Sequence, residues 1–192
     1  MIRISLPVSE EEVRKLRVGD EVLLSGRIVT ARDMAHKYMV EKKPAYLREL
    51  LSGSVIYHCG PVVEKQKGKY RIVAAGPTTS IREEPYENEV IESYGVRGII
   101  GKGGMGPRTR KALKKYGAVY FSATGGLAVV LADAVKEVQD VLMLKQFGVP
   151  EAMWVLRVED LLVLVTMDSH GRSLHDNVLT ESRSALEKLV SK

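Results

Sequence analysis

Short apolar segments alternate with helix-like segments between residues 86 and 135, and this rhythm constrains the fold more than any other feature. Residues 86–94, 107–116 and 127–135 have helical patterns, with a proline in the first turn of the second. Residues 96–100 and 118–122 are apolar runs typical of buried strands. Strands that alternate with helices pair in parallel through helical crossovers, so we expect parallel pairing here.

Other patterns before and after this region predict antiparallel pairing. Residues 62–75 are typical of a hairpin that turns at Lys67 and Gly68. Residues 153–158 and 161–167 predict two further strands that meet at Glu159 and Asp160. The chain is therefore predicted to be an α/β protein whose mixed sheet contains parallel and antiparallel strands.

The N-terminal part supplies the remaining local signals. Ser9 and Glu12 form a capping-box pattern at the start of a short helix. Residues 21–30 predict a strand bent at Gly26, or a hairpin, and residues 54–58 predict a short strand. A closing helix is expected near residues 180–190.

Length and composition predict one soluble domain over residues 1–192. A chain of 192 residues with 45% apolar and 28% charged side chains can bury an ordinary core. No apolar run has the length of a secretory signal or a membrane span, which predicts a cytoplasmic location and no membrane partner. The single cysteine, Cys59, forms no internal disulfide and provides too few thiolates for an iron–sulfur cluster.

The net charge of +5 arises from 29 basic and 24 acidic residues that mostly alternate. Aromatic residues make up only 6% of the chain, which disfavours a nucleic-acid-binding surface. A mild positive potential suits a small anionic substrate.

Three glycine-bearing segments, at 76–82, 101–107 and 123–127, each follow a predicted strand and lead into a predicted helix. Ligands collect at such junctions in sheets with parallel strands, because helix N-termini direct free amide groups outward. Thr78 adds a hydroxyl group, Arg82 a planar fork for a carboxylate, and Lys102 a compact charge. The combination favours a small molecule with two acidic groups, either carboxylates or phosphates. Tight turns or helix caps are the alternative interpretation of each glycine segment.

Arg32, Asp33 and His36 form a second group of candidate residues. They suit a substrate clamp if a helix begins at this point. The alternative is that Asp33 is an N-cap while Arg32 and His36 form surface pairs. The pattern alone leaves both open.

Several motifs in order resemble the β subunit, or C-terminal domain, of class I iron–sulfur hydro-lyases such as fumarase and L-tartrate dehydratase. They include Arg-Asp-Met-Ala-His at 32–36, Tyr-His-Cys-Gly-Pro at 57–61, Gly-Pro-Thr-Thr-Ser-Ile-Arg at 76–82 and Gly-Lys-Gly-Gly-Met-Gly-Pro at 101–107. The resemblance continues through residues 121–129 and 151–160 to Met-Asp-Ser-His-Gly at 167–171.

This resemblance implies a swivelling β/β/α fold and a site shared with an α subunit that carries a [4Fe–4S] cluster, with no cofactor or metal on this chain. It implies that Arg32, Arg82 and Lys102 contact a dicarboxylate substrate and that Thr78 is the catalytic base. The expected reaction is the reversible hydration of fumarate to malate, in a homodimer of this chain or an α2β2 complex. Glu83 and Glu84 depart from the family pattern, so substrate preference near them is open.

Two alternatives accompany this hypothesis. The same apparatus could dehydrate tartrate to oxaloacetate. The chain could also be a non-catalytic anion-binding or regulatory module without an enzymatic partner.

Overall fold

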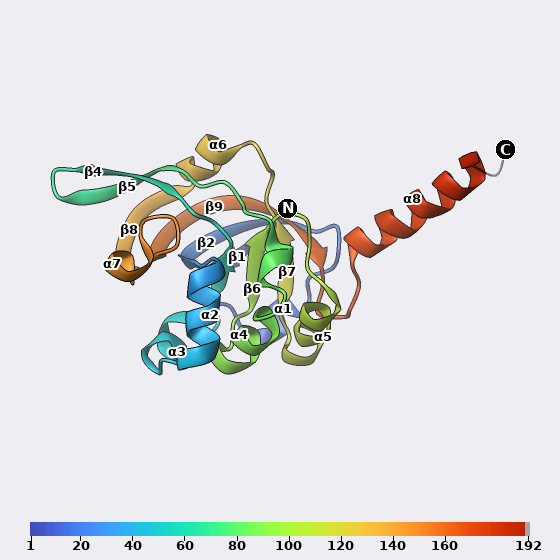
Figure 1. The fold of residues 1–192 in the computed structure, drawn as a ribbon, viewed down its shortest axis with the longest axis horizontal. Coiled ribbons are helices and arrows are strands. Elements are labelled where there is room, and N and C mark those ends of the chain that lie inside the picture. Colours follow the sequence, from blue (N-terminus) through green and yellow to red (C-terminus); the bar gives the residue numbers. More distant parts are fainter. Residues whose placement is uncertain (191–192) are drawn as a thin grey trace.

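A mixed seven-stranded sheet forms the centre of the molecule in the computed structural model, which describes residues 1–190 (Figure 1). Its strand order is β1-β2-β3-β6-β7-β9-β8, and a separate hairpin consists of β4 and β5. The strands are β1 (Ile2–Ser5), β2 (Glu21–Thr30), β3 (Val55–Tyr57), β4 (Val62–Gln66), β5 (Lys69–Ala74), β6 (Gly98–Gly101), β7 (Val119–Ser122), β8 (Val135–Leu142) and β9 (Met153–Met167).

Parallel and antiparallel pairings occur in the same sheet, which confirms the predicted fold class. Strands β1, β2, β3, β6 and β7 pair in parallel, each with its neighbour. Strand β9 is antiparallel to both β7 and β2, so these pairings close a ring of strands from β2 through β3, β6, β7 and β9 back to β2. Strand β8 continues the sheet beyond β9 in antiparallel pairing.

Helices pack mainly on one side of this sheet, where α2, α3, α4 and α5 lie together (Figure 1). The helices are α1 (Glu10–Val13), α2 (Asp33–Lys42), α3 (Tyr46–Leu51), the 3-10 helix η1 (Ser80–Glu83), α4 (Glu87–Tyr94), α5 (Pro107–Tyr116), α6 (Ala128–Asp133), α7 (Leu144–Phe147) and α8 (Leu174–Val190).

Alternating side chains of the strands supply two different cores. In β3, Val55 and Tyr57 join the cluster enclosed by the ring of strands, whereas Ile56 packs with Met39 of α2 and Val90 of α4 on the helical face. This alternation follows from the two-residue period of a strand. Both faces of the sheet are therefore buried.

Local signals near the N-terminus are confirmed. Ser9 Oγ accepts a hydrogen bond from the Glu12 amide, and the Ser9 amide donates one to the Glu12 carboxylate, as in a capping box. Strand β2 is continuous through Gly26, with a register shift between Leu24 and Gly26. The hairpin of β4 and β5 also turns where expected, with Lys67 and Gly68 at positive φ.

The prediction of two strands within residues 153–167 is wrong, because β9 is one strand. Both halves pair with β2, as shown by the partners Leu24 with Leu161 and Gly26 with Val158. Asp160 adopts φ 51°, and its amide donates to Ser25 Oγ at 2.9 Å. A long common neighbour thus keeps the strand continuous through a local irregularity.

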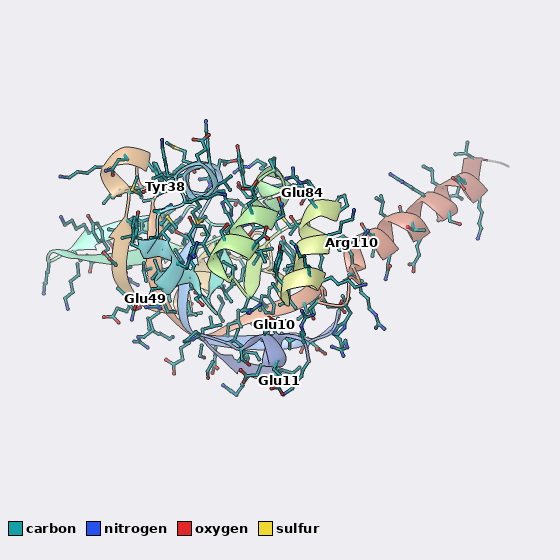
Figure 2. The ribbon with its side chains drawn as sticks, turned by 90° about the horizontal axis from the view of Figure 1, so that it is seen from below. Glu10, Glu11, Tyr38, Glu49, Glu84 and Arg110 are labelled. Carbon is teal, nitrogen blue, oxygen red and sulfur yellow. The ribbon has the colours of Figure 1, made fainter. Side chains whose placement is uncertain are left out.

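Helix α8 contacts the rest of the chain through its first turn, where His175 Nε2 lies 3.0 Å from Thr166 Oγ1, and it then projects away in both views (Figures 1 and 2). None of its described side chains is buried. Within residues 1–190, we find no helix with both the length and the apolar character required to cross a bilayer.

Candidate functional site

The carboxyl ends of four neighbouring strands meet at one edge of the sheet. Strands β2, β3, β6 and β7 pair in parallel, so the segments that follow them emerge side by side. Arg32 follows β2, Gly60 follows β3, and Lys102 follows β6. This edge is the candidate site.

Arg32 precedes α2 and is held by the segment before β9. Its Nε lies 3.3 Å from Glu151 Oε1, and its Nη1 donates to the Pro150 carbonyl at 3.3 Å. Gly60 makes room for this guanidinium, because a Cβ atom there would collide with Arg32 Nη1 and lie 2.8 Å from the Pro150 carbonyl oxygen. The Arg32 side chain is 20% exposed, so the guanidinium remains accessible at the edge.

Thr78 and Lys102 are joined through their main chains. The Lys102 amide donates to the Thr78 carbonyl at 3.2 Å, and the Ser80 amide donates to the Lys102 carbonyl at 3.1 Å. The Thr78 amide and hydroxyl both donate to the His58 carbonyl, at 2.7 and 3.0 Å. Lys102 itself is exposed, and its Cδ passes near Gly125 in the segment after β7. The second and third glycine segments therefore lie together.

Arg82 reaches the same edge from η1. Its Nη2 donates to Asp33 Oδ2 at 2.8 Å, and both side chains are nearly half exposed. Asp33 is adjacent to Arg32, so this ion pair places the two arginines at neighbouring positions. The structure thus brings Arg32, Thr78, Arg82 and Lys102 to one edge, whereas their chemical roles stay predictions.

The N-terminus of α5 is not a free anion site, contrary to the expectation for the glycine segment at 101–107. The Glu84 carboxylate accepts from the amides of Gly106 at 2.8 Å and Arg108 at 2.9 Å, and from Thr109 Oγ1 at 2.6 Å. Glu84 lies beside α5 in Figure 2. An internal carboxylate thus occupies the position that an anionic ligand would take.

The surface-pair interpretation of His36 is wrong, because its ring is fully buried. Nε2 of His36 and Nε2 of His58 each lie 3.0 Å from Oε2 of Glu87. A second carboxylate, from Glu83, lies 3.7 Å from His36 Nδ1. His36 therefore belongs to a buried polar cluster beneath the edge rather than to a clamp that touches substrate.

The charges in this cluster follow from burial and mutual contact. Burial alone raises the pKa of Glu87, but the charge and hydrogen bond of His36 and the bond from His58 lower it to about 2. Burial lowers the pKa of His36, whereas Glu87 and Glu83 raise it to about 9. Burial also lowers the pKa of His58, against the opposing hydrogen bond of Glu87. Near neutral pH the cluster therefore contains a charged His36, an ionised Glu87 and a neutral His58.

Glu83 is the least satisfied member of the cluster. Burial raises its pKa to about 7, although His36 opposes this effect. Neither carboxylate oxygen has a hydrogen-bond partner within the described part of the chain. Glu83 was noted in the sequence only as a departure from the family pattern, and Glu87 was not singled out. Glu83 ends η1 and Glu87 begins α4, so the two carboxylates come from separate elements.

Few residues could hold a metal or a cluster. Within residues 1–190, His36, His58 and Glu87 form a group whose ligand atoms lie within 4.8 Å of one another. Cys59, the single cysteine, is buried in the core, and burial raises its pKa to about 12 despite the nearby Arg32 charge. These residues do not fit an iron–sulfur cluster, which requires several accessible thiolates.

Sequence comparison gives the family of this mixed α/β chain. The family model described as fumarase C-terminus matches residues 1–178. The chain belongs to the fumarase C-terminal family.

Individual relatives agree with this assignment. The chain is 48% identical over 98% of its length to a Geobacillus stearothermophilus protein provisionally named fumarate hydratase class I, and it spans 36% of that protein. It is 41% identical to a Methanocaldococcus jannaschii protein provisionally named L(+)-tartrate dehydratase subunit beta, with 95% of each chain covered. It is 39% identical to the L(+)-tartrate dehydratase subunit beta of Escherichia coli K12, over 89% of this chain and 85% of that one. The chain thus corresponds to about a third of one relative and to nearly the whole of two others.

Proposed function

We propose that this chain is the β subunit of a two-subunit hydro-lyase that reversibly adds water to fumarate to form malate. The observation that carries the proposal is the gathering of Arg32, Arg82 and Lys102 at one sheet edge, although they are distant in the sequence. The relative with 48% identity bears the name fumarate hydratase class I. The edge would be shared with an α subunit.

The arginines and the lysine would bind the two carboxylates of the substrate. Arg82 uses one N–H group on Asp33, which leaves the rest of its fork for a substrate carboxylate. Lys102 would add a positive charge against the negative charge that develops on the carbon skeleton during proton removal. The placement of three cations at one edge suits a dianion better than a monoanion.

Thr78 would lie beside the carbon that exchanges a proton. Its hydroxyl donates to the His58 carbonyl, an acceptor that does not stabilise a threonine alkoxide. To act as the base, the hydroxyl would first have to give up its own proton, because a neutral hydroxyl is too weak a base to take one from carbon. A base on the α subunit is therefore the alternative to Thr78.

The [4Fe–4S] cluster would be held by the α subunit, because this chain has one cysteine and that residue is buried. An iron with an open position would supply Lewis-acid chemistry toward the hydroxyl group. The chain alone would then be inactive and without iron–sulfur absorbance.

Tartrate dehydration is the second candidate, and it has its own supporting observation. The two relatives whose length this chain nearly spans are named L(+)-tartrate dehydratase subunit beta. Both reactions remove water from a hydroxy-diacid, so the same three cations suit either substrate.

Anaerobic co-expression with the α subunit tests both candidates. The purified complex is assayed in parallel with fumarate, malate, L-tartrate and D-tartrate. We expect turnover of fumarate and malate at least tenfold above that of either tartrate, and loss of this activity in Arg32→Ala. Arg27→Ala, which changes an exposed arginine on β2, the strand before Arg32, is the matched control.

The outcomes separate the alternatives. Preference for L-tartrate would replace the fumarate proposal with the tartrate candidate. Failure to co-purify any cluster-bearing partner from the native host would favour the non-catalytic module, as would a complex without activity on all four diacids. Full activity of Arg32→Ala would remove Arg32 from the substrate site.

A further inference from the structure

A continuous chain of buried polar side chains runs beneath the candidate site. Its members come from different elements: His36 from α2, His58 from the segment after β3, Ser80 from η1, Glu87 from α4 and Tyr120 from β7. All of them are fully buried. Burying this many polar groups is costly unless they are hydrogen-bonded. The hydrogen bonds between these side chains therefore offset the cost of burying them.

One half of the chain ends at the main chain of Arg32. The Arg32 carbonyl can only accept, so His36 Nδ1 donates to it at 2.9 Å. His36 Nε2 then donates to the ionised Glu87 carboxylate at 3.0 Å. Both ring nitrogens of His36 are donors, which is the imidazolium form, and its charge is balanced by Glu87.

The other half has a single consistent direction. His58 Nε2 donates to the same Glu87 oxygen at 3.0 Å, which leaves Nδ1 of the neutral ring as an acceptor. Ser80 Oγ lies 2.9 Å from this Nδ1 and donates to it, and Tyr120 Oη donates to Ser80 Oγ at 2.8 Å. Each hydroxyl and ring N–H of this half has a partner.

Every residue of the candidate site except Arg82 is joined to these buried polar residues by a hydrogen bond that involves main-chain atoms. Thr78 donates its amide and hydroxyl to the His58 carbonyl. Lys102 accepts from the Ser80 amide through its carbonyl, and its amide donates to Thr78. Arg32 accepts from both the ring and the amide of His36. Arg82 belongs to η1, the helix that Ser80 begins.

A metal ion is the other use of His36, His58 and Glu87. The hydrogen-bond assignment above accounts for every ring nitrogen of the two histidines without a cation. A cation at this position would have to replace both N–H groups that point to Glu87. The chain of hydrogen bonds is therefore the better account of the geometry.

We propose that His36, Glu87 and His58 form a positioning unit that holds the main chain of Arg32, Thr78 and Lys102 in the arrangement that binds substrate. This inference rests on the proposed function for its catalytic readout. Glu87 is the central member because it accepts from both histidines. None of these residues touches substrate, so they are positioning residues rather than catalytic ones.

Glu87→Gln tests the unit with minimal change of volume, and Glu89→Gln on the same helix is the matched control. Glu89 is partly exposed and pairs only loosely with Lys43 at 3.8 Å. In the complex, displaced Arg32 and Lys102 weaken substrate binding, so we expect Glu87→Gln to raise KM about tenfold, with kcat also reduced. A merely structural role would reduce the amount of folded enzyme and leave KM unchanged.

Amide hydrogen exchange of the 192-residue chain without its partner provides the second readout. We expect the Thr78 and Lys102 amides of Glu87→Gln to exchange at least tenfold faster, while the Leu6 amide, which bonds to Ser25 at the other end of the sheet, is unchanged. A wild-type complex without hydro-lyase activity would refute the proposed function, and the exchange rates would still decide the positioning role. Unchanged exchange at both amides, or a stoichiometric metal lost from Glu87→Gln, would overturn the inference.

Discussion

The Arg82 guanidinium donates a 2.8 Å hydrogen bond to the Asp33 carboxylate, although 49 positions separate the two residues. This contact joins η1 to the start of α2. Asp33 orients the fork of Arg82 and also neutralises part of its charge. The geometry of the planar fork should therefore matter more than its charge alone.

Arg82→Lys should lose nearly as much activity as Arg82→Ala. A lysine keeps the charge but cannot bond to Asp33 and a substrate carboxylate in one plane. We expect both variants to lower kcat/KM on the order of 100-fold in the complex. Steady-state kinetics with fumarate measure this, with Arg71→Lys on the exposed hairpin as the control. Wild-type kcat/KM in Arg82→Lys would show that charge alone suffices.

Gly60→Ala should act through Arg32. A Cβ atom at this position would collide with the guanidinium and with the Pro150 carbonyl, so Arg32 must move. We expect kcat/KM to fall about tenfold, with little further loss when Gly60→Ala is added to Arg32→Ala. In Gly125→Ala the new Cβ would meet only Lys102 Cδ at 3.8 Å, an ordinary contact, so its effect should be smaller. Additive losses in the double variant would contradict the mechanism.

Glu84→Ala should destabilise the fold without direct involvement in chemistry. The carboxylate satisfies amides at the first turn of α5 and the hydroxyl of Thr109. Losing these bonds should lower the free energy of unfolding by about 2 kcal/mol. Urea unfolding measures the change, and Glu64→Ala on the exposed hairpin should have little effect. An unchanged midpoint would show that water replaces the carboxylate without cost.

Glu83 should make stability fall as the pH rises from about 4.5 to about 7. Its pKa is raised in the folded state from 4.5 to about 7, so the folded chain keeps a proton that the unfolded chain loses. The contribution is fully present below pH 4.5 and is lost as the pH passes 7. Glu83→Gln has no carboxyl group to titrate at this position. Relative to wild type, we expect its free energy of unfolding to rise by about 1–2 kcal/mol between pH 4.5 and pH 7.

Urea unfolding at several pH values measures this difference. A constant difference between Glu83→Gln and wild type from pH 4.5 to 7 would mean that the Glu83 carboxyl ionises as readily in the folded chain as in the unfolded one.

Cys59 should resist thiol reagents in the native chain. The side chain is buried, and burial raises its pKa to about 12, so very little thiolate is present near neutral pH. We expect modification by a disulfide reagent to proceed at the rate of unfolding, and to become fast in denaturant. Rapid reaction in native buffer would show that this segment opens locally.

Local patterns determined much of the fold. The capping box at Ser9, the turn at Lys67 and Gly68, and the proline start of α5 depend on nearby residues, so the sequence alone predicts them. The order of the strands and the continuity of β9 depend on distant partners, and the two-strand prediction failed for that reason.

The candidate site also combines features that local sequence predicts with features that depend on distant residues. Its cations and its threonine were identified from glycine segments and motif order, because strand ends and residue types are local properties. The sequence did not show that Glu84 occupies the α5 N-terminus, that Asp33 pairs with Arg82, or that Glu87 joins His36 to His58. Those relationships connect residues on separate elements, and only the packing of helices against a closed sheet brings such side chains within hydrogen-bond distance.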